Sequence, residues 1–274
     1  MGKFSYHWKK PLGSTVIVKV CVLASSSSGN STFVGTDRTR ILIDAGLSRL
    51  QTRQRLAAIG EDVDKLDAIL ITHEHSDHVA GLLRIAVNKD GKIPVYMSHK
   101  TAPMIDWEGR EPIVEEFQSG TRLCVGEFEI DSFTIPHDAV DPVGFCLRAQ
   151  GIQVGIITDL GYVPDSVKMH ARGSDLLVFE SNHNLEMLKV GPYPWPLKQR
   201  IMGRNGHLSN DAASVFIVED LDTRVSNLIL GHLSEYNNHP ELVRQMAVQS
   251  LELRSHSARL TVAEPGKQIE PFFY

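Results

Sequence analysis

The chain has 274 residues, is 42% hydrophobic and carries a formal net charge of −5. This length suits one large α/β domain as well as two small ones, and the acidic balance argues against a broad, strongly basic nucleic-acid surface. Three cysteines, Cys21, Cys124 and Cys146, lie in apolar contexts without paired spacing, and no apolar run could span a membrane. We therefore expect buried reduced thiols, a cytoplasmic protein and no membrane contact.

The first predicted elements are short strands at residues 19–23 and 32–34, joined by the serine-rich turn 25–31. Two interpretations of this turn remain open. It is either a flexible loop or a cradle of backbone amides and hydroxyls for an anion, in which Ser27 would contact the substrate. Residues 1–18 precede the first strand, and we expect them to be an extension that is either disordered or an artefact of the gene model.

The next elements are a strand at 40–43, a helix capped by Ser48 and ending near Gly60, and the apolar strand 66–71. An apolar strand followed by a capped helix and a second apolar strand is typical of the first half of a layered α/β fold.

A cluster of metal-ligating residue types directly follows the strand 66–71. His73 and His75 share a face if the chain stays extended, and Asp77 and His78 follow where a helical pattern begins. The two adjacent sets of donors suggest two metal ions. Imidazole nitrogen and carboxylate oxygen suit zinc, manganese or iron. The alternative is a solvated, histidine-rich loop.

The remaining predicted elements form a β meander and then return to alternation of strands and helices. The meander comprises strands at 93–97, 121–125, 128–135, 143–148 and 152–158, with a helix near Thr101. The alternating part comprises strands at 176–179, 228–230 and 259–262, with helices at 196–202, 210–219 and 241–253. Two such halves are expected to pack sheet on sheet with helices outside.

Four isolated polar residues each follow an apolar strand: Asp44, His137, Asp159 and His232. Any one of them alone would be interpreted as a cap or a hydrogen-bonded loop residue. Because sheet ends are where such folds gather function, and because the histidine cluster still lacks ligands, we interpret the four together as parts of one site.

These residues in this order resemble the five-motif signature of the metallo-β-lactamase superfamily. The resemblance implies a four-layer αββα sandwich over residues 19–274, made of two mixed sheets with helices on both outer faces. It also implies two metal ions that share Asp159, and it makes Asp44 a carboxylate that orients ligands. The first ion would be held by His73, His75 and His137. The second ion would be held by Asp77, His78 and His232.

Four further segments, 20–31, 179–184, 193–201 and 206–210, are similar to the YycJ/VicX/WalJ group of bacterial hydrolases of this fold. That group is associated with 5′-to-3′ DNA exonuclease activity. The resemblance therefore implies a phosphodiesterase acting on DNA through a hydroxide that bridges two metal ions, with Asp77 hydrogen-bonded to that hydroxide. Members of the group usually begin near the first strand, which is why residues 1–18 look like an extension.

Two further histidines are candidate substrate ligands. His207 resembles the additional histidine of the phosphodiesterase branch, which contacts phosphate and assists the leaving oxygen. The alternative for His207 is a polar loop residue before a capped helix. His183 has the same ambiguity with a weaker case, since residues 180–183 also fit a polar strand end.

The proline-rich segment 190–201 offers candidate contacts for a nucleic acid. Arg200 and Lys198 would grip phosphate, and Tyr193 or Trp195 would stack on a base. Equally, packing between proline and tryptophan would simply anchor the segment.

Two other functions remain open at this stage. One is an acyl hydrolase of the same fold that acts on a thioester or a lactone. The other is a metal-bearing regulatory protein without catalysis. The metal, whether zinc, manganese or iron, and the oligomeric state are not specified by the sequence.

Overall fold

The central strands of each sheet bury both faces, which is what allows two sheets to pack between helices. On β1 (Lys19–Ala24), Val20 and Val22 face one hydrophobic cluster, while Cys21 and Leu23 face another. The first cluster also contains residues of the second sheet, so it is the layer between the sheets. The computed structural model describes residues 18–88 and 91–274, so apart from Val18 the expected extension lies outside the described residues.

The first sheet has seven strands in the order β16-β1-β2-β3-β4-β7-β8. Pairing is antiparallel from β16 to β3 and parallel from β3 to β8, and a hairpin of β5 and β6 stands apart. The bounds after β1 are β2 (Ser31–Gly35), β3 (Arg40–Ile43), β4 (Ala68–Leu70), β5 (Val87–Asn88), β6 (Gly91–Lys92), β7 (Val95–Ser98), β8 (Val114–Phe117) and β16 (Phe272–Phe273).

The second sheet mirrors this arrangement in the order β15-β14-β13-β12-β11-β10-β9. Its strands pair in parallel from β15 to β12 and antiparallel from β12 to β9. Both sheets are therefore mixed. The strands are β9 (Arg122–Val125), β10 (Phe128–Thr134), β11 (Val143–Ala149), β12 (Ile152–Ile157), β13 (Leu176–Glu180), β14 (Asn227–Gly231) and β15 (Arg259–Val262).

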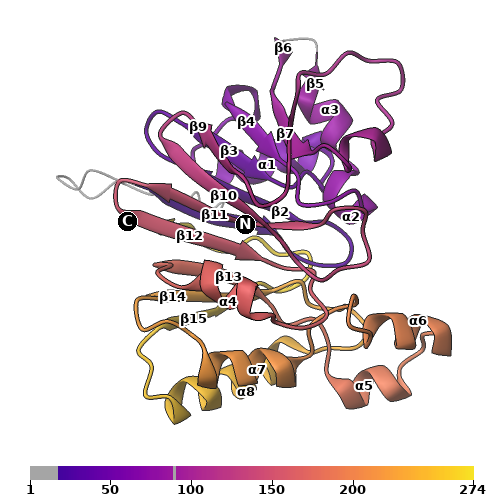
Figure 1. Ribbon diagram of the computed structural model, residues 1–274, viewed down its shortest axis with the longest axis vertical. Coiled ribbons are helices and arrows are strands. Elements are labelled where there is room, and N and C mark those ends of the chain that lie inside the picture. The colour runs from indigo at the N-terminus through magenta and orange to yellow at the C-terminus, as the bar shows by residue number, and fades with distance from the viewer. Residues whose placement is uncertain (1–17, 89–90) are drawn as a thin grey trace, which may run out of the picture.

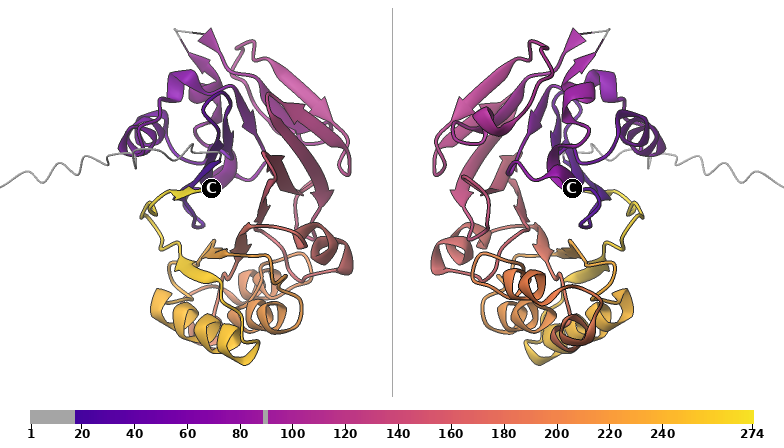
Figure 2. Two further views of the ribbon diagram at one scale, coloured as in Figure 1. Left: turned by 90° about the vertical axis from the view of Figure 1, so that its left-hand side faces the viewer. Right: turned by 90° about the vertical axis from the view of Figure 1, so that its right-hand side faces the viewer.

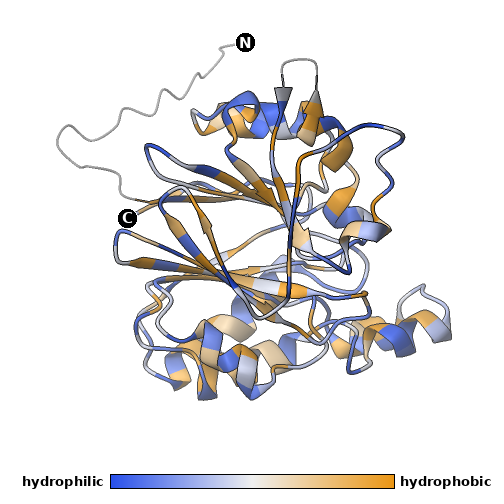
Figure 3. Cartoon of the chain, turned by 45° about the horizontal axis from the view of Figure 1, so that its top comes forward, coloured by the Kyte–Doolittle hydropathy of each residue, from blue (hydrophilic) through white to orange (hydrophobic). Residues whose placement is uncertain are grey.

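Helices cover the outer face of each sheet, which confirms the predicted four-layer αββα sandwich (Figures 1 and 2). Hydrophobic residues concentrate on the strands between these layers (Figure 3). The first sheet packs against α1 (Arg49–Ala58) and α3 (Leu82–Ala86), next to α2 (Ser76–Val79), η1 (Val63–Lys65) and η2 (Ala102–Met104). The second packs against α4 (Asp165–Ala171), α7 (Asn210–Glu219) and α8 (Pro240–Leu253), while α5 (Leu185–Val190) and α6 (Trp195–Ile201) extend to one side.

Some elements differ from the prediction. The helix expected near Thr101 is the short 3₁₀ turn η2, and β8, α4 and α5 were not predicted. These elements are short, and β8 is mostly exposed, so none carries a long periodic pattern. Cys124 was expected to be buried but is exposed on β9, whereas Cys21 and Cys146 are buried. No helix within residues 18–88 or 91–274 is long and apolar enough to cross a membrane.

Candidate functional site

Three of the predicted strand-end residues adopt left-handed backbone conformations. Asp44 follows β3 with φ 59°, Asp159 lies beyond β12 with φ 63°, and His232 follows β14 with φ 55°. This region is uncommon for residues other than glycine, and such strain is typical of functional sites. Close packing holds the neighbouring turn, because a Cβ on Gly46 would lie 1.8 Å from the carbonyl oxygen of Asp77. The turns after these strands are therefore held in one conformation.

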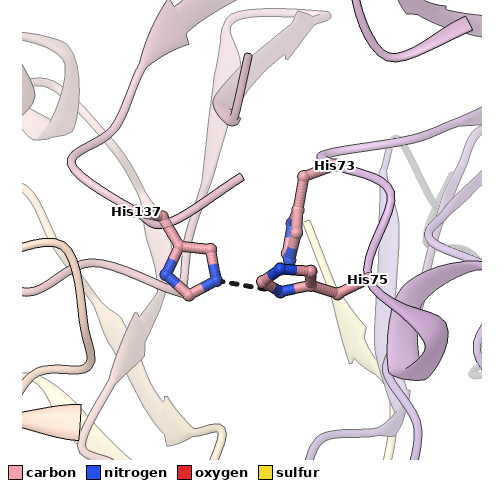
Figure 4. A group of neighbouring side chains, drawn as sticks. All are labelled: His73, His75 and His137. Carbon is pink, nitrogen blue, oxygen red and sulfur yellow. Dashed lines mark hydrogen bonds between the residues drawn. The ribbon is translucent and has the colours of Figure 1, made fainter. Parts of the chain in front are cut away.

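His73, His75 and His137 form one group of converging imidazoles (Figure 4). Their donor atoms lie within 4.8 Å of one another, and His75 Nδ1 is 3.2 Å from His137 Nε2. The Nε2 atom of His73 is buried without a hydrogen-bond partner. Burial holds the pKa of His73 well below its usual value, which favours the neutral ring that a metal requires.

A second group contains Asp77, His78 and His232, again with donor atoms within 4.8 Å. Asp159 lies between the two groups. Its Oδ1 is 3.2 Å from His232 Nε2 and 4.0 Å from His137 Nε2, while its Oδ2 is 3.4 Å from His78 Nε2. The two groups coincide with the two ligand sets that the resemblance implies.

The donor set fits a divalent metal centre. The Oδ2 atom of Asp159 is buried and makes no hydrogen bond, like the Nε2 atom of His73. Leaving such polar atoms buried without partners is costly, and a cation between them would remove that cost. Neutral imidazoles with carboxylates are also the ligands that zinc and related transition metals take.

Three polar residues orient the donors. Asp44 Oδ2 accepts a hydrogen bond from His78 Nδ1 at 2.8 Å, and its Oδ1 accepts one from the Thr72 amide at 2.9 Å. Asn30 donates to Asp77 Oδ2 at 2.9 Å and accepts from His232 Nδ1 at 3.2 Å. Neither Asn30 nor Thr72 was predicted as a site residue, although Asn30 lies in the serine-rich turn 25–31.

A buried carboxylate holds His207 beside the second group. Glu180 is fully buried at the end of β13, and its Oε1 accepts a hydrogen bond from His207 Nδ1 at 2.7 Å. Its Oε2 accepts from the amides of Leu160 at 2.8 Å and Leu208 at 3.2 Å. Burial alone would lower the pKa of His207, but Glu180 and then Asp159 raise it to about 9. Sequence reasoning missed this role of Glu180.

Five of the residues described above, His75, Asp77, Asp159, His207 and His232, line a pocket of about 360 Å³. Its rim includes Ser27, Asp138, Tyr193 and Arg200, and Asp138 forms an ion pair with Arg200. The complete lining is Ser27, His75, Ser76, Asp77, Asp138, Asp159, Asn182, Tyr193, Leu197, Arg200, Ile201, Gly206, His207, His232 and Ser234.

Other predicted contacts lie elsewhere. Lys198 was expected to grip phosphate, but it is buried and its Nζ donates to the carbonyl of Lys189 at 2.7 Å, so that prediction is wrong. His183 is buried outside the pocket lining, where its backbone pairs with that of Ser209. Trp195 is exposed and is not among the described residues that line the pocket.

A four-layer sandwich with these donor groups at its edge defines a metal-dependent hydrolase of the metallo-β-lactamase fold. More specifically, the sequence model described as the beta-lactamase superfamily domain matches residues 39–233, and the chain belongs to this family. The fold is also that of the metallo-β-lactamase fold protein YhfI from Bacillus subtilis, with a TM-score of 0.70 at 19% identity over 92% of this chain and 99% of that one.

Two curated relatives cover most of the chain. Exodeoxyribonuclease YycJ of Bacillus anthracis is 37% identical over 239 residues, which is 84% of this chain and 88% of that protein. Exodeoxyribonuclease WalJ of Streptococcus pneumoniae is 37% identical over 243 residues, which is 87% of this chain and 90% of that protein. The resemblance to the YycJ/WalJ group is thereby confirmed.

Proposed function

We propose that this chain is a dinuclear metal-dependent phosphodiesterase that degrades DNA as an exonuclease. The observation that carries the proposal is the Glu180–His207 pair, which stands directly beside the shared carboxylate Asp159 and the second donor group. A pair of this kind supplies a proton at a fixed place, which the departure of a sugar oxygen from phosphorus requires. The names of the relatives YycJ and WalJ support DNA as the substrate.

The two donor groups would hold the two ions, with Asp159 contributing to both. Divalent ions bound there, whether zinc, manganese or iron, would supply activated water and would neutralise charge on the attacked phosphoryl group. The protein residues around them fix the ligands. Asp44 and Asn30 hold His78 and His232 through their Nδ1 atoms, which leaves the Nε2 atoms of both rings facing Asp159.

His207 would hold the proton that the leaving oxygen takes up. Its Nδ1 is committed to Glu180, so Nε2 is the free ring nitrogen at the pocket. The ring also stacks on that of His232 with centroids 5.1 Å apart, which fixes its orientation. Glu180 cannot easily turn away, because both of its oxygens accept hydrogen bonds in a buried position. His207 is thus the proton donor and Glu180 is its positioning residue.

Arg200 and Ser27 would contact the substrate at the rim. Both line the pocket and both are exposed. The Arg200 guanidinium is paired with Asp138, and a phosphate oxygen would compete with that carboxylate for it. The hydroxyl of Ser27 is a neutral donor in the lining, next to Ser26, whose amide donates to the buried Asn30 side chain.

The test is a side-by-side assay of the purified, metal-loaded protein on end-labelled single- and double-stranded DNA, a lactone and a glutathione thioester. We expect stepwise shortening of DNA from the 5′ end, the polarity that the resemblance implies, and no turnover of the two acyl substrates. Elemental analysis of the same preparation should give two divalent ions per chain. Acyl hydrolysis without DNA cleavage would overturn the proposal.

A further inference from the structure

The pocket is too small to enclose a polymer. At about 360 Å³ it lies at the low end of the range of roughly 300–1,000 Å³ that small-ligand sites occupy. If the substrate is a nucleic acid, only the groups next to the scissile phosphodiester enter, and the neighbouring nucleotide contacts the rim. The rim must therefore contain surfaces that suit a nucleotide.

Two tyrosines form an aromatic corner at this rim. Tyr193 lines the pocket from the segment between α5 and α6. Tyr236, from the loop after β14, is not part of the described lining and lies next to the rim through its contact with Tyr193. Their ring centroids are 5.9 Å apart and their planes meet at 65°. Tyr236 is 63% exposed, and neither ring belongs to the hydrophobic clusters formed by the described residues. Tyrosine is enriched at binding surfaces because it combines an apolar ring with a polar tip, so an exposed ring next to the pocket suits contact with a ligand.

The aromatic corner is supported by α5, α6 and the loop that follows β14. α5 and α6 lie side by side at one side of the sandwich (Figure 1), joined by the buried Lys198 amine and the Lys189 carbonyl. The loop that carries Tyr236 touches this pair closely. A Cβ on Gly191 would lie 2.2 Å from Asn237 Oδ1, and the Asn184 amide donates to the Asn237 carbonyl at 2.9 Å. Both rings are therefore displayed on one fixed support, so little entropy is lost when they contact a ligand.

Charged residues next to the two tyrosines in the chain would favour one path for a bound strand. Arg200 follows Tyr193 on the same segment and also lines the pocket. Glu235 precedes Tyr236, is exposed, and accepts a hydrogen bond from the Ser28 hydroxyl at 2.5 Å. Phosphate is attracted to Arg200 and repelled by Glu235. The backbone would pass on the Arg200 side, which leaves the apolar face of a base for the two rings.

We propose that Tyr193 and Tyr236 form a stacking subsite for the nucleobase of a nucleotide that flanks the scissile phosphodiester. This inference rests on the proposed phosphodiesterase function and names the part of the substrate that the rim recognises. Stacking on tyrosine accepts any base, because every base has a π face. The subsite therefore gives affinity for nucleic acid without sequence preference.

The test compares oligonucleotides that carry a base-free sugar at either nucleotide flanking the first scissile bond with the intact oligonucleotide. For the wild type, we expect removal of the base at one of the two positions to lower kcat/KM about tenfold or more. Tyr236→Ala should lower kcat/KM on the intact oligonucleotide by a similar factor. Its kcat/KM should then be about the same on the intact and on the base-free oligonucleotide. Tyr236→Phe retains the ring and should behave like the wild type.

Binding provides a second readout. An oligonucleotide with 2-aminopurine at the sensitive position and a non-hydrolysable linkage at the scissile bond should lose fluorescence on binding to the wild type and to Tyr236→Phe, but much less on binding to Tyr236→Ala. Tyr162→Ala is the matched control. Tyr162 is 38% exposed and lies under the Arg204 guanidinium at 4.7 Å. Among the described residues it neither lines the pocket nor packs against Tyr193, as Tyr236 does, so its removal should leave base discrimination intact.

The possible failures are separable. If the wild type cleaves no DNA, the proposed function is wrong, and so is the stacking subsite that rests on it. If the wild type cleaves intact and base-free oligonucleotides equally well at both positions, the subsite is wrong while the phosphodiesterase stands. This second comparison needs no variant, so it holds even where Tyr236→Ala does not fold.

Discussion

The pocket has a floor and a rim that are built in opposite ways. The floor consists of the two donor groups and Asp159, and five of these seven donors are buried while His75 and Asp77 are partly buried. Asp44 holds His78 through a hydrogen bond. The rim, Ser27, Asp138, Tyr193 and Arg200, is partly or fully exposed. Its one ion pair, between Asp138 and Arg200, faces solvent and water can replace it.

This difference separates chemistry from recognition. His73 Nε2 and Asp159 Oδ2 are buried without a hydrogen-bond partner, which is costly, and a bound cation would remove that cost. The floor is thus suited to binding metal ions, and it should tolerate few substitutions. Each exposed contact at the rim contributes less free energy to binding, and each residue there can be substituted without disturbing the others. Substitutions in the floor should therefore abolish metal binding and turnover together, whereas substitutions at the rim should change substrate affinity alone.

The largest effect is expected for His73→Ala in the floor. Removing a buried imidazole from the first donor group should reduce bound metal and lower kcat by at least about a thousandfold, because metal ions supply several kcal/mol of transition-state stabilisation. Elemental analysis and DNA cleavage by the same sample measure both. His99→Ala, in an exposed histidine outside the donor groups, is the control and should change neither. Full metal content and full turnover in His73→Ala would show that the ligand set is wrong.

His207→Ala should give the next largest effect and should keep the metal. We expect kcat on DNA to fall by about 10²–10⁴, the usual contribution of a positioned acid. With a p-nitrophenyl phosphodiester the loss should be much smaller, because that leaving group departs without a proton. Glu180→Gln should behave similarly, because glutamine has only one acceptor oxygen. Its NH₂ group would face either the Leu160 and Leu208 amides or the Nδ1–H of His207, and all of these are donors.

The comparison of leaving groups decides the role of the Glu180–His207 pair. Equal losses of kcat on DNA and on the p-nitrophenyl ester would mean that the pair shapes the pocket but transfers no proton. A fall in metal content in either variant would indicate that His207 is itself a metal ligand. The geometry allows this, because Asp159, Glu180, His207 and His232 form one further group of converging donor atoms.

The residues of the floor were predictable from local sequence, whereas their division into two ligand sets came from the resemblance to the metallo-β-lactamase superfamily. His73 to His78 form a compact cluster after a strand, and Asp44, Asp159 and His232 each interrupt apolar sequence at a strand end. The sandwich was predictable for the same reason, since long apolar strands such as β11 and β12 are unambiguous. A pattern confined to a few neighbouring residues suffices to pick out each strand and each candidate ligand, but not to say which ligands share a metal ion.

The rim and the support of His207 depend on contacts between distant segments. Glu180 resembles any polar strand end until β13 is placed between β12 and β14, where its carboxylate meets amides from two other loops. Lys198 looked like a phosphate ligand, but α6 turns it inward to Lys189. Nothing near Tyr236 in the sequence indicates that it packs against Tyr193. Such relations follow from tertiary packing, which propensity and spacing do not encode.

The smallest effect is expected at the ion pair of the rim, and there the two partners should act in opposite directions. Arg200→Ala removes a cation from the pocket and should raise KM for oligonucleotides roughly tenfold with kcat unchanged, as expected for a charge-assisted contact to phosphate. Asp138→Asn removes the competing carboxylate and should lower KM. Steady-state kinetics at two salt concentrations measures both, and the salt dependence of affinity should weaken by about 0.7 in log–log slope for Arg200→Ala.

Trp195→Ala is the matched control, because Trp195 lies on the same helix and is 57% exposed but, among the described residues, does not line the pocket. We expect its KM to stay within about twofold of the wild type, as for other surface substitutions. If Asp138→Asn instead raises KM as much as Arg200→Ala does, the ion pair serves to hold α6 in place and Arg200 does not contact phosphate. The rim would then owe its affinity to the aromatic corner alone, and Tyr236→Ala would become the more damaging change.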